Sequence, residues 1–282
     1  MPLVTTGEIT GPAMAAGRGV GAFNVIQLEH ATAITAGAER AGLPVVLQIS
    51  ENAVLYHGAL EPVAAATLAI ARAASVPVAV HLDHATDRML VEQAVTLGLT
   101  SVMFDASTLP YEENVAVTAS VAEHCHRAGV WLEAELGEVG GKDGVHAPGV
   151  RTDPAEAAAY VAATGVDGLA VAVGTSHAMS TRTAALDFEL IGRLRAGVEV
   201  PLVLHGSSGV SDDDLARAVA HGMVKVNIAT HLNGCFTAAV RETLAAQPRL
   251  TDPRKYLGPG RTAVADEVAR LLRVLAGPPA AG

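Results

Sequence analysis

The sequence predicts an α/β protein folded as a closed (β/α)8 TIM barrel. Eight short segments rich in Val, Ile and Leu recur along the 282 residues, and Ala-rich stretches with helical spacing lie between most of them. Strands that alternate with helices become parallel strands joined by right-handed crossovers, and eight such units in about 250 residues match a closed barrel. Because no linker or internal repeat indicates a second domain, we expect one barrel domain over residues 1–282 with a C-terminal helical tail.

Most of the expected strands begin after Pro or Gly, which separate them from the preceding helix. In chain order they are GAFNV (21–25), PVVLQIS (44–50), PVAVHLDH (77–84), SVMFDAS (101–107), WLEAELG (131–137), GLAVAVG (168–174), PLVLHGSS (201–208) and MVKVNIAT (223–230). Helical spacing of apolar residues is clear in intervals such as Leu28–Ala41, 61–74 and 213–221.

Nearly every expected strand ends in polar side chains, which favours the barrel over an open doubly wound sheet, because barrel enzymes gather their active sites at that end. These residues are Asn24, Gln48, Ser50, Asp83, His84, Asp105, Glu135, His205, Ser208, Asn227 and Thr230. An open dinucleotide-binding sheet would carry GxGxxG after its first strand. The GRGVG run at 17–21 has different spacing and precedes the strand.

Composition and charge exclude several classes of protein. Nineteen Lys and Arg against 29 Asp and Glu give a net charge of −10 without a basic cluster, so we expect no nucleic-acid partner. No apolar run approaches the roughly 18 residues of a membrane span, so we expect no membrane association and a cytoplasmic location. Cys125 and Cys235 lie far apart, so His and carboxylate side chains must hold any metal.

Three of the eleven histidines fall at or just beyond expected strand ends, namely His84, His177 and His205. Three imidazoles with a fourth coordination position open are typical of a catalytic zinc. Separate, hydrogen-bonded core histidines would have the same spacing, so the pattern alone leaves both interpretations open.

Other histidines are weaker candidates. His81 is expected to face the barrel wall and to support a ligand without binding the metal itself. His124 and His126 flank Cys125, but residues two apart on a helix point to nearly opposite sides, so we expect ordinary helix-surface residues there.

Three carboxylates accompany the histidines. Asp83 is adjacent to His84 and cannot point the same way along an extended strand, so it is available for proton transfer above the metal. Asp105 and Glu135 end neighbouring strands, where they could hold a second cation or orient the metal ligands.

Two segments indicate phosphate binding, because barrels frequently bind phosphate in the loops after strands seven and eight. They are HGSSG and NIAT, with the small residues Gly206, Ser207, Ser208, Gly209 and Thr230. The glycine-rich run Gly137–Gly144 predicts a mobile lid, with a disordered surface loop as the alternative.

These residues together resemble the class II, metal-dependent ketose-bisphosphate aldolases, the fructose- and tagatose-bisphosphate type, over nearly the whole chain. The motifs that carry the resemblance are AFN at Ala22, HLDHAT at His81, SVMFDAS, EAELGEVGG at Glu133, AVAVGTSH, PLVLHGSSG, KVNIAT at Lys225 and DPRKYLGPGR at Asp252.

The resemblance implies zinc on the three histidines, Asp83 as proton donor and acceptor at the C4 hydroxyl, and Glu135 and Asp105 lining the metal site. It implies that zinc stabilises the negative charge left when the C3–C4 bond breaks, in place of the Schiff-base lysine of other aldolases. The products would be dihydroxyacetone phosphate and an aldehyde.

The resemblance also assigns the two ends of the substrate. Four residues would hold the dihydroxyacetone-phosphate half, with a sodium or potassium ion often nearby: Gly206, Ser208, Asn227 and Thr230. Asn24 and Ser50 would face the far end, and Arg254 and Arg261 are candidates for a far phosphate or carboxylate, or else for helix-end salt bridges.

The chain departs from the family pattern at three places. The loop usually carries a Glu after GG, whereas here Lys142 and Asp143 follow, so Asp143 is the candidate acid. Ala178 replaces a common Gly after His177. The last strand continues as Asn227, Ala229, Thr230 and His231, closer to the tagatose-type N-x-A-T-E than to N-x-D-T-D.

Several alternatives stay open at this stage. They are an aldolase for a phosphorylated deoxyketogluconate of inositol breakdown, a non-catalytic phosphosugar-binding barrel, and a catalytic subunit that needs a companion protein. We expect a homodimer or a homotetramer.

Overall fold

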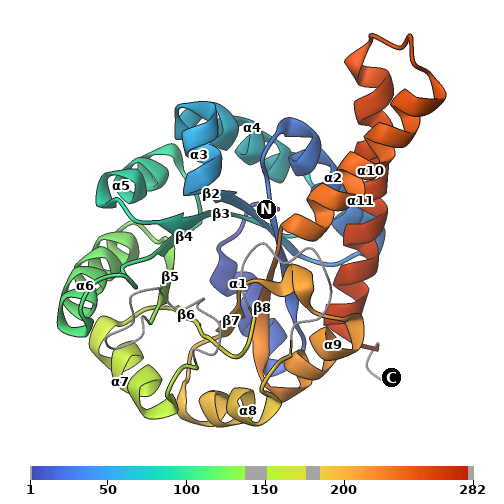
Figure 1. Cartoon of the computed structure of the whole chain (residues 1–282). Helices are drawn as coiled ribbons and strands as arrows, with labels where there is room; N and C mark the ends of the chain where they lie inside the picture. The colour runs from blue at the N-terminus through green and yellow to red at the C-terminus, as the bar shows by residue number, and fades with distance from the viewer. Residues whose placement is uncertain (1, 137–150, 176–184, 279–282) are drawn as a thin grey trace.

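The computed structural model describes residues 2–136, 151–175 and 185–278. Its eight strands pair in parallel in chain order, and β1 also pairs with β8, so the sheet closes into a barrel ringed by helices (Figure 1). The strands are β1 (Val20–Asn24), β2 (Val45–Ser50), β3 (Val78–Ala85), β4 (Ser101–Phe104), β5 (Trp131–Glu135), β6 (Gly168–Ala170), β7 (Leu202–Leu204) and β8 (Met223–Ile228). The predicted (β/α)8 barrel is confirmed, although β6 is shorter than its apolar segment.

Helices follow the strands around the outside of the barrel. Their bounds are α1 (Thr6–Ala15), α2 (Leu28–Ala41), α3 (Glu51–His57), α4 (Leu60–Ala73), α5 (Arg88–Leu97), α6 (Tyr111–Arg127), α7 (Pro154–Thr164), α8 (Phe188–Gly197), α9 (Asp212–His221), α10 (Thr230–Ala246) and α11 (Pro253–Ala276), with a short 3-10 helix, η1 (Ser207–Gly209). In the described part of the chain no single helix is long and apolar enough to cross a membrane, and only the bent pair α3 and α4 passes that test together.

The barrel interior changes from apolar to polar along its axis. At the N-terminal end of the strands, Ile9 of α1 packs against small apolar side chains of β1, β2 and β3, and so closes that end. Farther along, charged and polar side chains are fully buried inside the barrel, among them His81, Glu133 and Lys225. The main apolar core lies instead between the strands and the surrounding helices.

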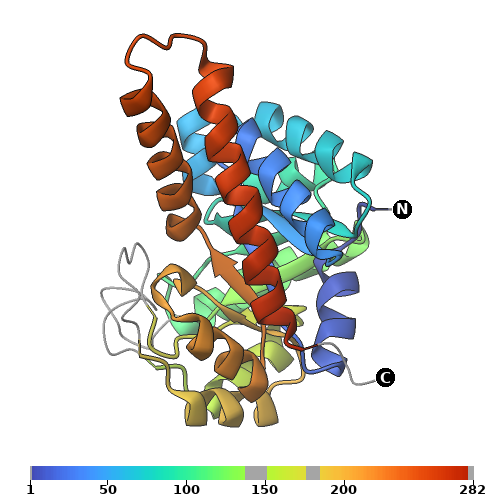
Figure 2. The same ribbon diagram turned by 90° about the vertical axis from the view of Figure 1, so that its right-hand side faces the viewer.

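The last two helices, α10 and α11, form a hairpin that projects from the barrel (Figures 1 and 2). The long helix α11 is fixed to the barrel by close packing against α2. Gly37 of α2 allows this approach, because a Cβ atom there would lie 2.6 Å from the Ala265 carbonyl oxygen and 2.8 Å from Val268 Cβ.

We expect Gly37→Ala to lower the free energy of unfolding by about 1–3 kcal/mol, because the added methyl meets the backbone of α11. Gly192→Ala is the matched control, since Gly192 is also in a helix and its Cβ would meet nothing within 4 Å. That control should raise the stability by about 0.5–1 kcal/mol through helix propensity. Urea unfolding at one protein concentration, followed by circular dichroism, measures both. Equal effects of the two variants would contradict the packing argument.

Candidate active site

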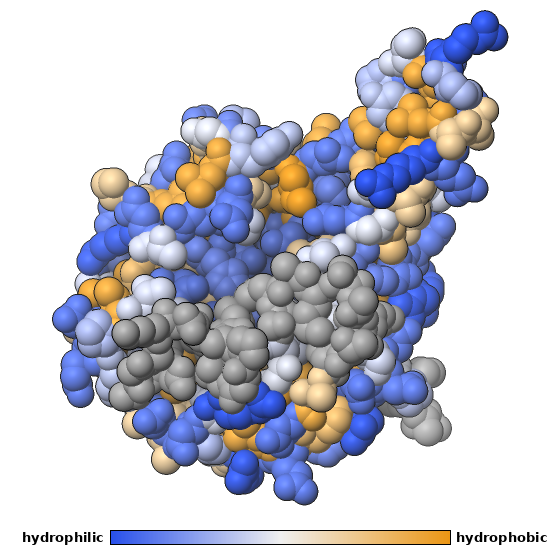
Figure 3. Space-filling view, in the orientation of Figure 1, coloured by the Kyte–Doolittle hydropathy of each residue, from blue (hydrophilic) through white to orange (hydrophobic). Residues whose placement is uncertain are grey.

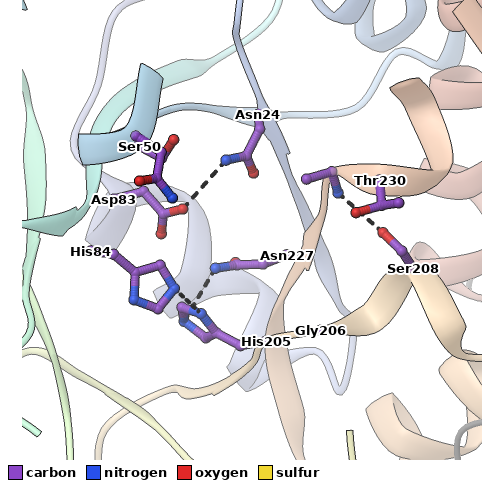
Figure 4. Close-up of a pocket in the computed structure, with 11 residues that line it drawn as sticks. Asn24, Ser50, Asp83, His84, His205, Gly206, Ser208, Asn227 and Thr230 are labelled. Carbon is purple, nitrogen blue, oxygen red and sulfur yellow. Dashed lines mark hydrogen bonds between the residues drawn. The ribbon is translucent and has the colours of Figure 1, made fainter. Parts of the chain in front are cut away.

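A cavity of about 150 Å³ opens at the C-terminal ends of the strands, and polar side chains converge on it (Figure 4). Its lining residues are Asn24, Ser50, Asn52, Asp83, His84, His205, Gly206, Ser208, Asn227, Ala229 and Thr230. Of the predicted site residues that the structure describes, the barrel therefore brings all to this cavity except Asp105 and Glu135.

A β-bulge in β3 places both Asp83 and His84 at this cavity. The pairing of β3 with β4 shifts between Leu82 and Ala85, and His84 has a φ of +53°, the only positive φ of a non-glycine residue in the described ranges. The sequence-based expectation that these neighbours point apart assumed a regular extended strand. That assumption is wrong here, because the bulge turns the His84 side chain toward the cavity beside Asp83.

Two imidazole nitrogens face each other at the centre of the site. Nε2 of His84 lies 2.9 Å from Nδ1 of His205. Nδ1 of His84 lies 2.9 Å from Asp105 Oδ2, and Nε2 of His205 lies 2.9 Å from Glu133 Oε1. Each carboxylate accepts the N–H of its imidazole, so the facing nitrogens are the ones available to a metal.

Asp105 and Glu135 lie on the side of the His84 ring that faces away from His205. Glu135 Oε2 is 3.9 Å from Nδ1 of His84. Burial alone would lower the pKa of His84, but the charge of Asp83, the hydrogen bond to Asp105 and the charge of Glu135 raise it to about 10. This arrangement supports the interpretation in which Asp105 orients a ligand.

Asp83 is 4% exposed and is oriented by a chain of amides. Its Oδ2 accepts a hydrogen bond from Asn24 Nδ2 at 3.4 Å (Figure 4). Asn24 Oδ1 in turn accepts one from Gln48 Nε2 at 3.1 Å. Oδ1 of Asp83 is buried without a hydrogen-bond partner in the described part of the chain. A buried carboxylate oxygen directed at a cavity is suited to a ligand hydroxyl or a cation.

Beneath the histidine pair lies a buried ion pair. Lys225 Nζ donates to Glu133 Oε2 at 2.8 Å and to Asn227 Oδ1 at 3.0 Å, and both charged side chains are fully buried. His81 Nε2 is 3.8 Å from Glu133 Oε2, and burial followed by the Lys225 charge holds the pKa of His81 well below its usual range. His81 is thus a neutral neighbour of Glu133, inside the barrel.

The opposite side of the cavity consists of small residues and helix starts. Gly206 has a left-handed backbone, with a φ of 66°, and precedes η1. Ser208 Oγ accepts the backbone N–H groups of Ala229, at 3.3 Å, and His231, at 3.2 Å. Its own O–H is therefore directed elsewhere, and Thr230 begins α10 beside it (Figure 4).

A second cavity, of about 440 Å³, adjoins the first and shares Ser50, Asn52 and His84 with it. Its remaining lining residues are Glu51, Leu55, Thr86 and Asp105. Both oxygens of Glu51 are engaged by Thr86. The joined cavities provide room for a substrate longer than one phosphorylated three-carbon unit.

Some predicted residues cannot be placed. His177, Ala178, Lys142, Asp143 and the run 137–144 lie outside the described residues.

Other candidates lie away from the cavities. Arg254 is at the start of α11 and forms a two-pronged ion pair with Asp252, which supports the helix-end interpretation. His126 bonds Asp167 from α6, at 2.9 Å.

Sequence reasoning gave no role to Glu133, Lys225, Gln48 or Asn52. The alternation of side chains along a strand could have identified two of them. Glu133 and Lys225 each stand two residues before a predicted site residue on the same strand, and so face the barrel interior with it. A charged side chain on that face must be paired inside the barrel.

The donor set fits a zinc ion. Imidazole nitrogens at about 2.0–2.1 Å from a tetrahedral zinc would lie about 3.3 Å apart, close to the separation of the His84 and His205 nitrogens. Potential ligand atoms of Asp83, His84 and His205 all lie within 4.8 Å of one another. A carboxylate behind each imidazole is the usual support of zinc-binding histidines.

Comparisons with known proteins agree with this chemistry. The family model "Fructose-bisphosphate aldolase class-II" matches residues 4–277. A probable fructose-bisphosphate aldolase of Bacillus subtilis is 43% identical over 97% of both chains, and a fructose-bisphosphate aldolase of Geobacillus stearothermophilus is 41% identical over 97% of this chain and 96% of that one. The crystal structure of the YdjI aldolase from Escherichia coli K12 has a TM-score of 0.86 and 32% identity, over 97% of each chain. The chain therefore belongs to the class II fructose-bisphosphate aldolase family of metal-dependent lyases.

Proposed function

We propose that the protein cleaves a ketose 1,6-bisphosphate of the tagatose or fructose type, reversibly and with zinc, to dihydroxyacetone phosphate and an aldehyde. The observation that carries this proposal is the pair of imidazole nitrogens 2.9 Å apart, each ring supported by a carboxylate, beside the buried Asp83. Relatives named as fructose-bisphosphate aldolases support the substrate class.

His84 and His205 would hold the zinc ion, together with His177 from outside the described residues. When bound, zinc supplies an electrophile for the substrate oxygens and so stabilises negative charge on the dihydroxyacetone-phosphate half. Glu133 and Asp105 accept the outer N–H of each imidazole, so the facing nitrogens are the ones that would bind zinc once it displaces the proton of His84.

Asp83 would act at the C4 hydroxyl. During cleavage its carboxylate accepts the hydroxyl proton, the C4–O bond becomes a carbonyl, and the electron pair of the C3–C4 bond remains on C3. In the reverse direction Asp83 returns the proton to the new hydroxyl. Asn24, held by Gln48, aligns the carboxylate for both steps.

The proton that C3 gains must come from another acid. We propose Asp143 for this role, because it is the nearest acid to the position at which the family carries Glu. Its side chain is one methylene shorter, so it must approach the substrate more closely.

The phosphate would bind to Gly206, Ser208, Asn227 and Thr230, which line the cavity near the starts of η1 and α10. None of the lining residues within 2–136, 151–175 and 185–278 is a Lys or an Arg. A sodium or potassium ion beside the phosphate would offset its charge. Asn24 and Ser50 would face the aldehyde half, which would extend from the first cavity past Ser50 into the second.

We further propose a homodimer or homotetramer. The projecting hairpin supports it, because Leu244 on α10 is 36% exposed and Figure 3 shows hydrophobic surface on this projection. A cytoplasmic location and the need for a companion subunit both stay predictions.

The first test measures release of dihydroxyacetone phosphate from fructose and tagatose 1,6-bisphosphates by purified protein. We expect activity on at least one sugar, its loss after chelation, and its return with zinc. The preferred sugar defines the C4 configuration. Failure of folded, zinc-loaded protein on both sugars would contradict the proposal, and restored activity with a cell extract would then identify a missing companion.

Asp83→Asn should lower kcat by about 10²–10⁴-fold, because the amide cannot accept the hydroxyl proton. Zinc content serves as the control and should stay at the wild-type value.

Asp143→Asn should slow proton exchange at C3 of dihydroxyacetone phosphate, measured by NMR in deuterated water. Full activity of Asp143→Asn would remove Asp143 from the mechanism.

Zinc affinity should rise with pH near neutrality. Because the pKa of His84 is raised to about 10 without metal, zinc must displace a proton from the imidazole. The apparent affinity should then increase about tenfold per pH unit. Chelator competition at two pH values measures it, corrected for the protonation of the chelator. Asp105→Asn should give a shallower dependence, because it removes a group that raises the pKa of His84. Equal affinities at both pH values would contradict this assignment.

A further inference from the structure

A chain of charged side chains links α11 to the two segments at the phosphate side of the cavity. His231 Nε2 lies 2.6 Å from Glu267 Oε1. Arg270 donates to Glu267 through Nε at 2.8 Å and through Nη2 at 2.6 Å. The same guanidinium also donates to Asp212 through Nη1. Arg270 thus joins two carboxylates from different parts of the fold.

The two ends of this side-chain network, Asp212 and His231, follow closely in the sequence after the two proposed phosphate-binding segments. Asp212 is the first residue of α9, shortly after η1, and His231 is the second residue of α10. The backbone N–H of His231 donates to Ser208 Oγ, while its side chain contacts Glu267. One residue therefore connects the cavity lining to α11. Figure 2 shows α11 running alongside α10 and down to α9.

The network has the features that distinguish a structural ion-pair network from an ordinary surface pair. Glu267 is 17% exposed and Arg270 is 41% exposed, and Arg270 contacts both oxygens of Glu267. Burial alone would raise the pKa of Glu267, but hydrogen bonds with Arg270 and His231 outweigh it and lower the pKa to about 2. Glu267 is therefore charged at neutral pH. Two-pronged pairs within a network are the surface ion pairs that contribute measurably.

His231 stands at one of the positions where this sequence departs from the tagatose-type pattern. In the tagatose-type pattern an acid occupies that position, whereas here a histidine does, and the acid comes from Glu267 on α11. The departure noted in the sequence is thus matched by a partner on another helix.

We propose that Arg270 is a positioning residue for phosphate binding, which sets the spacing between the Gly206–Ser208 segment and the start of α10 through Asp212, Glu267 and His231. This inference rests on the proposed function, in which those segments hold the substrate phosphate. Arg270 does not touch the substrate. Its planar fork can bridge two carboxylates at once, which a lysine ammonium on a flexible chain does poorly.

The test compares Arg270→Gln, Arg270→Lys and the control Arg273→Gln. Arg273 is on the same helix, but its guanidinium donates to the Arg40 carbonyl oxygen, away from the phosphate side. With zinc-loaded protein, we measure kcat and KM for dihydroxyacetone phosphate in the condensation direction, and the Kd of inorganic phosphate by calorimetry.

We expect Arg270→Gln to raise both the KM and the phosphate Kd about fivefold to twentyfold, with kcat within about twofold of wild type. Arg270→Lys should recover part of the loss, and Arg273→Gln should change neither constant by more than about twofold. Should Arg270→Gln fold poorly, Asp212→Asn removes one end of the bridge with less change in volume and should also weaken phosphate binding.

A KM and a phosphate Kd for Arg270→Gln no higher than those of Arg273→Gln would overturn the proposal, as would an equal fall in kcat for all variants. The phosphate measurement needs no turnover. If wild-type protein cleaves neither sugar yet Arg270→Gln still weakens phosphate binding, the proposed function fails and the positioning role stands.

Discussion

The site depends on one buried carboxylate, that of Glu133. It accepts a hydrogen bond from Lys225 through one oxygen and from His205 through the other, at the centre of a barrel from which water is excluded. An unpaired charge at this place would cost several kcal/mol, so Glu133 and Lys225 require each other. The pair also fixes the tautomer of His205, because the Nε2 proton is held by Glu133 and Nδ1 is left facing His84. A charge pair that is weak evidence for stability is thus a strong determinant of metal-binding geometry.

The second constraint is backbone strain at His84. A left-handed conformation for a histidine costs of order 1 kcal/mol and persists only where the surroundings impose it. Here the bulge between Leu82 and Ala85 supplies the extra residue, and the Asp105 hydrogen bond holds the ring once it has turned. The result is that two consecutive residues, the proposed metal ligand His84 and the proposed acid–base group Asp83, line the same cavity. A regular strand would direct one of them into the surrounding helices.

The sequence was sufficient to predict the barrel, because eight apolar segments with helical intervals have few other solutions, and it placed the predicted residues at the correct end of the strands. It did not predict how Asp83 and His84 share a site, because alternation along a strand says nothing about a bulge. It also gave no role to Glu133 and Lys225, since inward parity does not reveal which strand residues meet across a barrel. That depends on the tilt and stagger of all eight strands. The network of Arg270 could not be predicted from local sequence patterns either. Arg270 and Asp212 are 58 residues apart, and Glu267 and His231 are 36 residues apart, each pair joining two different helices.

The charges around the cavity explain why the phosphate side must be held so precisely. Among the described residues that line the cavity there is no Lys or Arg, and Lys225, inside the barrel, is paired with Glu133. A phosphate there would rely on backbone N–H groups, hydroxyls and the positive ends of helix dipoles, all of which lose strength steeply with distance and misalignment. A single flexible cation could follow a displaced phosphate, whereas several fixed donors on separate segments cannot. Under the proposed function, recognition of phosphate in this barrel therefore depends on segment spacing, and the two α11 side chains proposed to set that spacing, Glu267 and Arg270, lie outside the cavity.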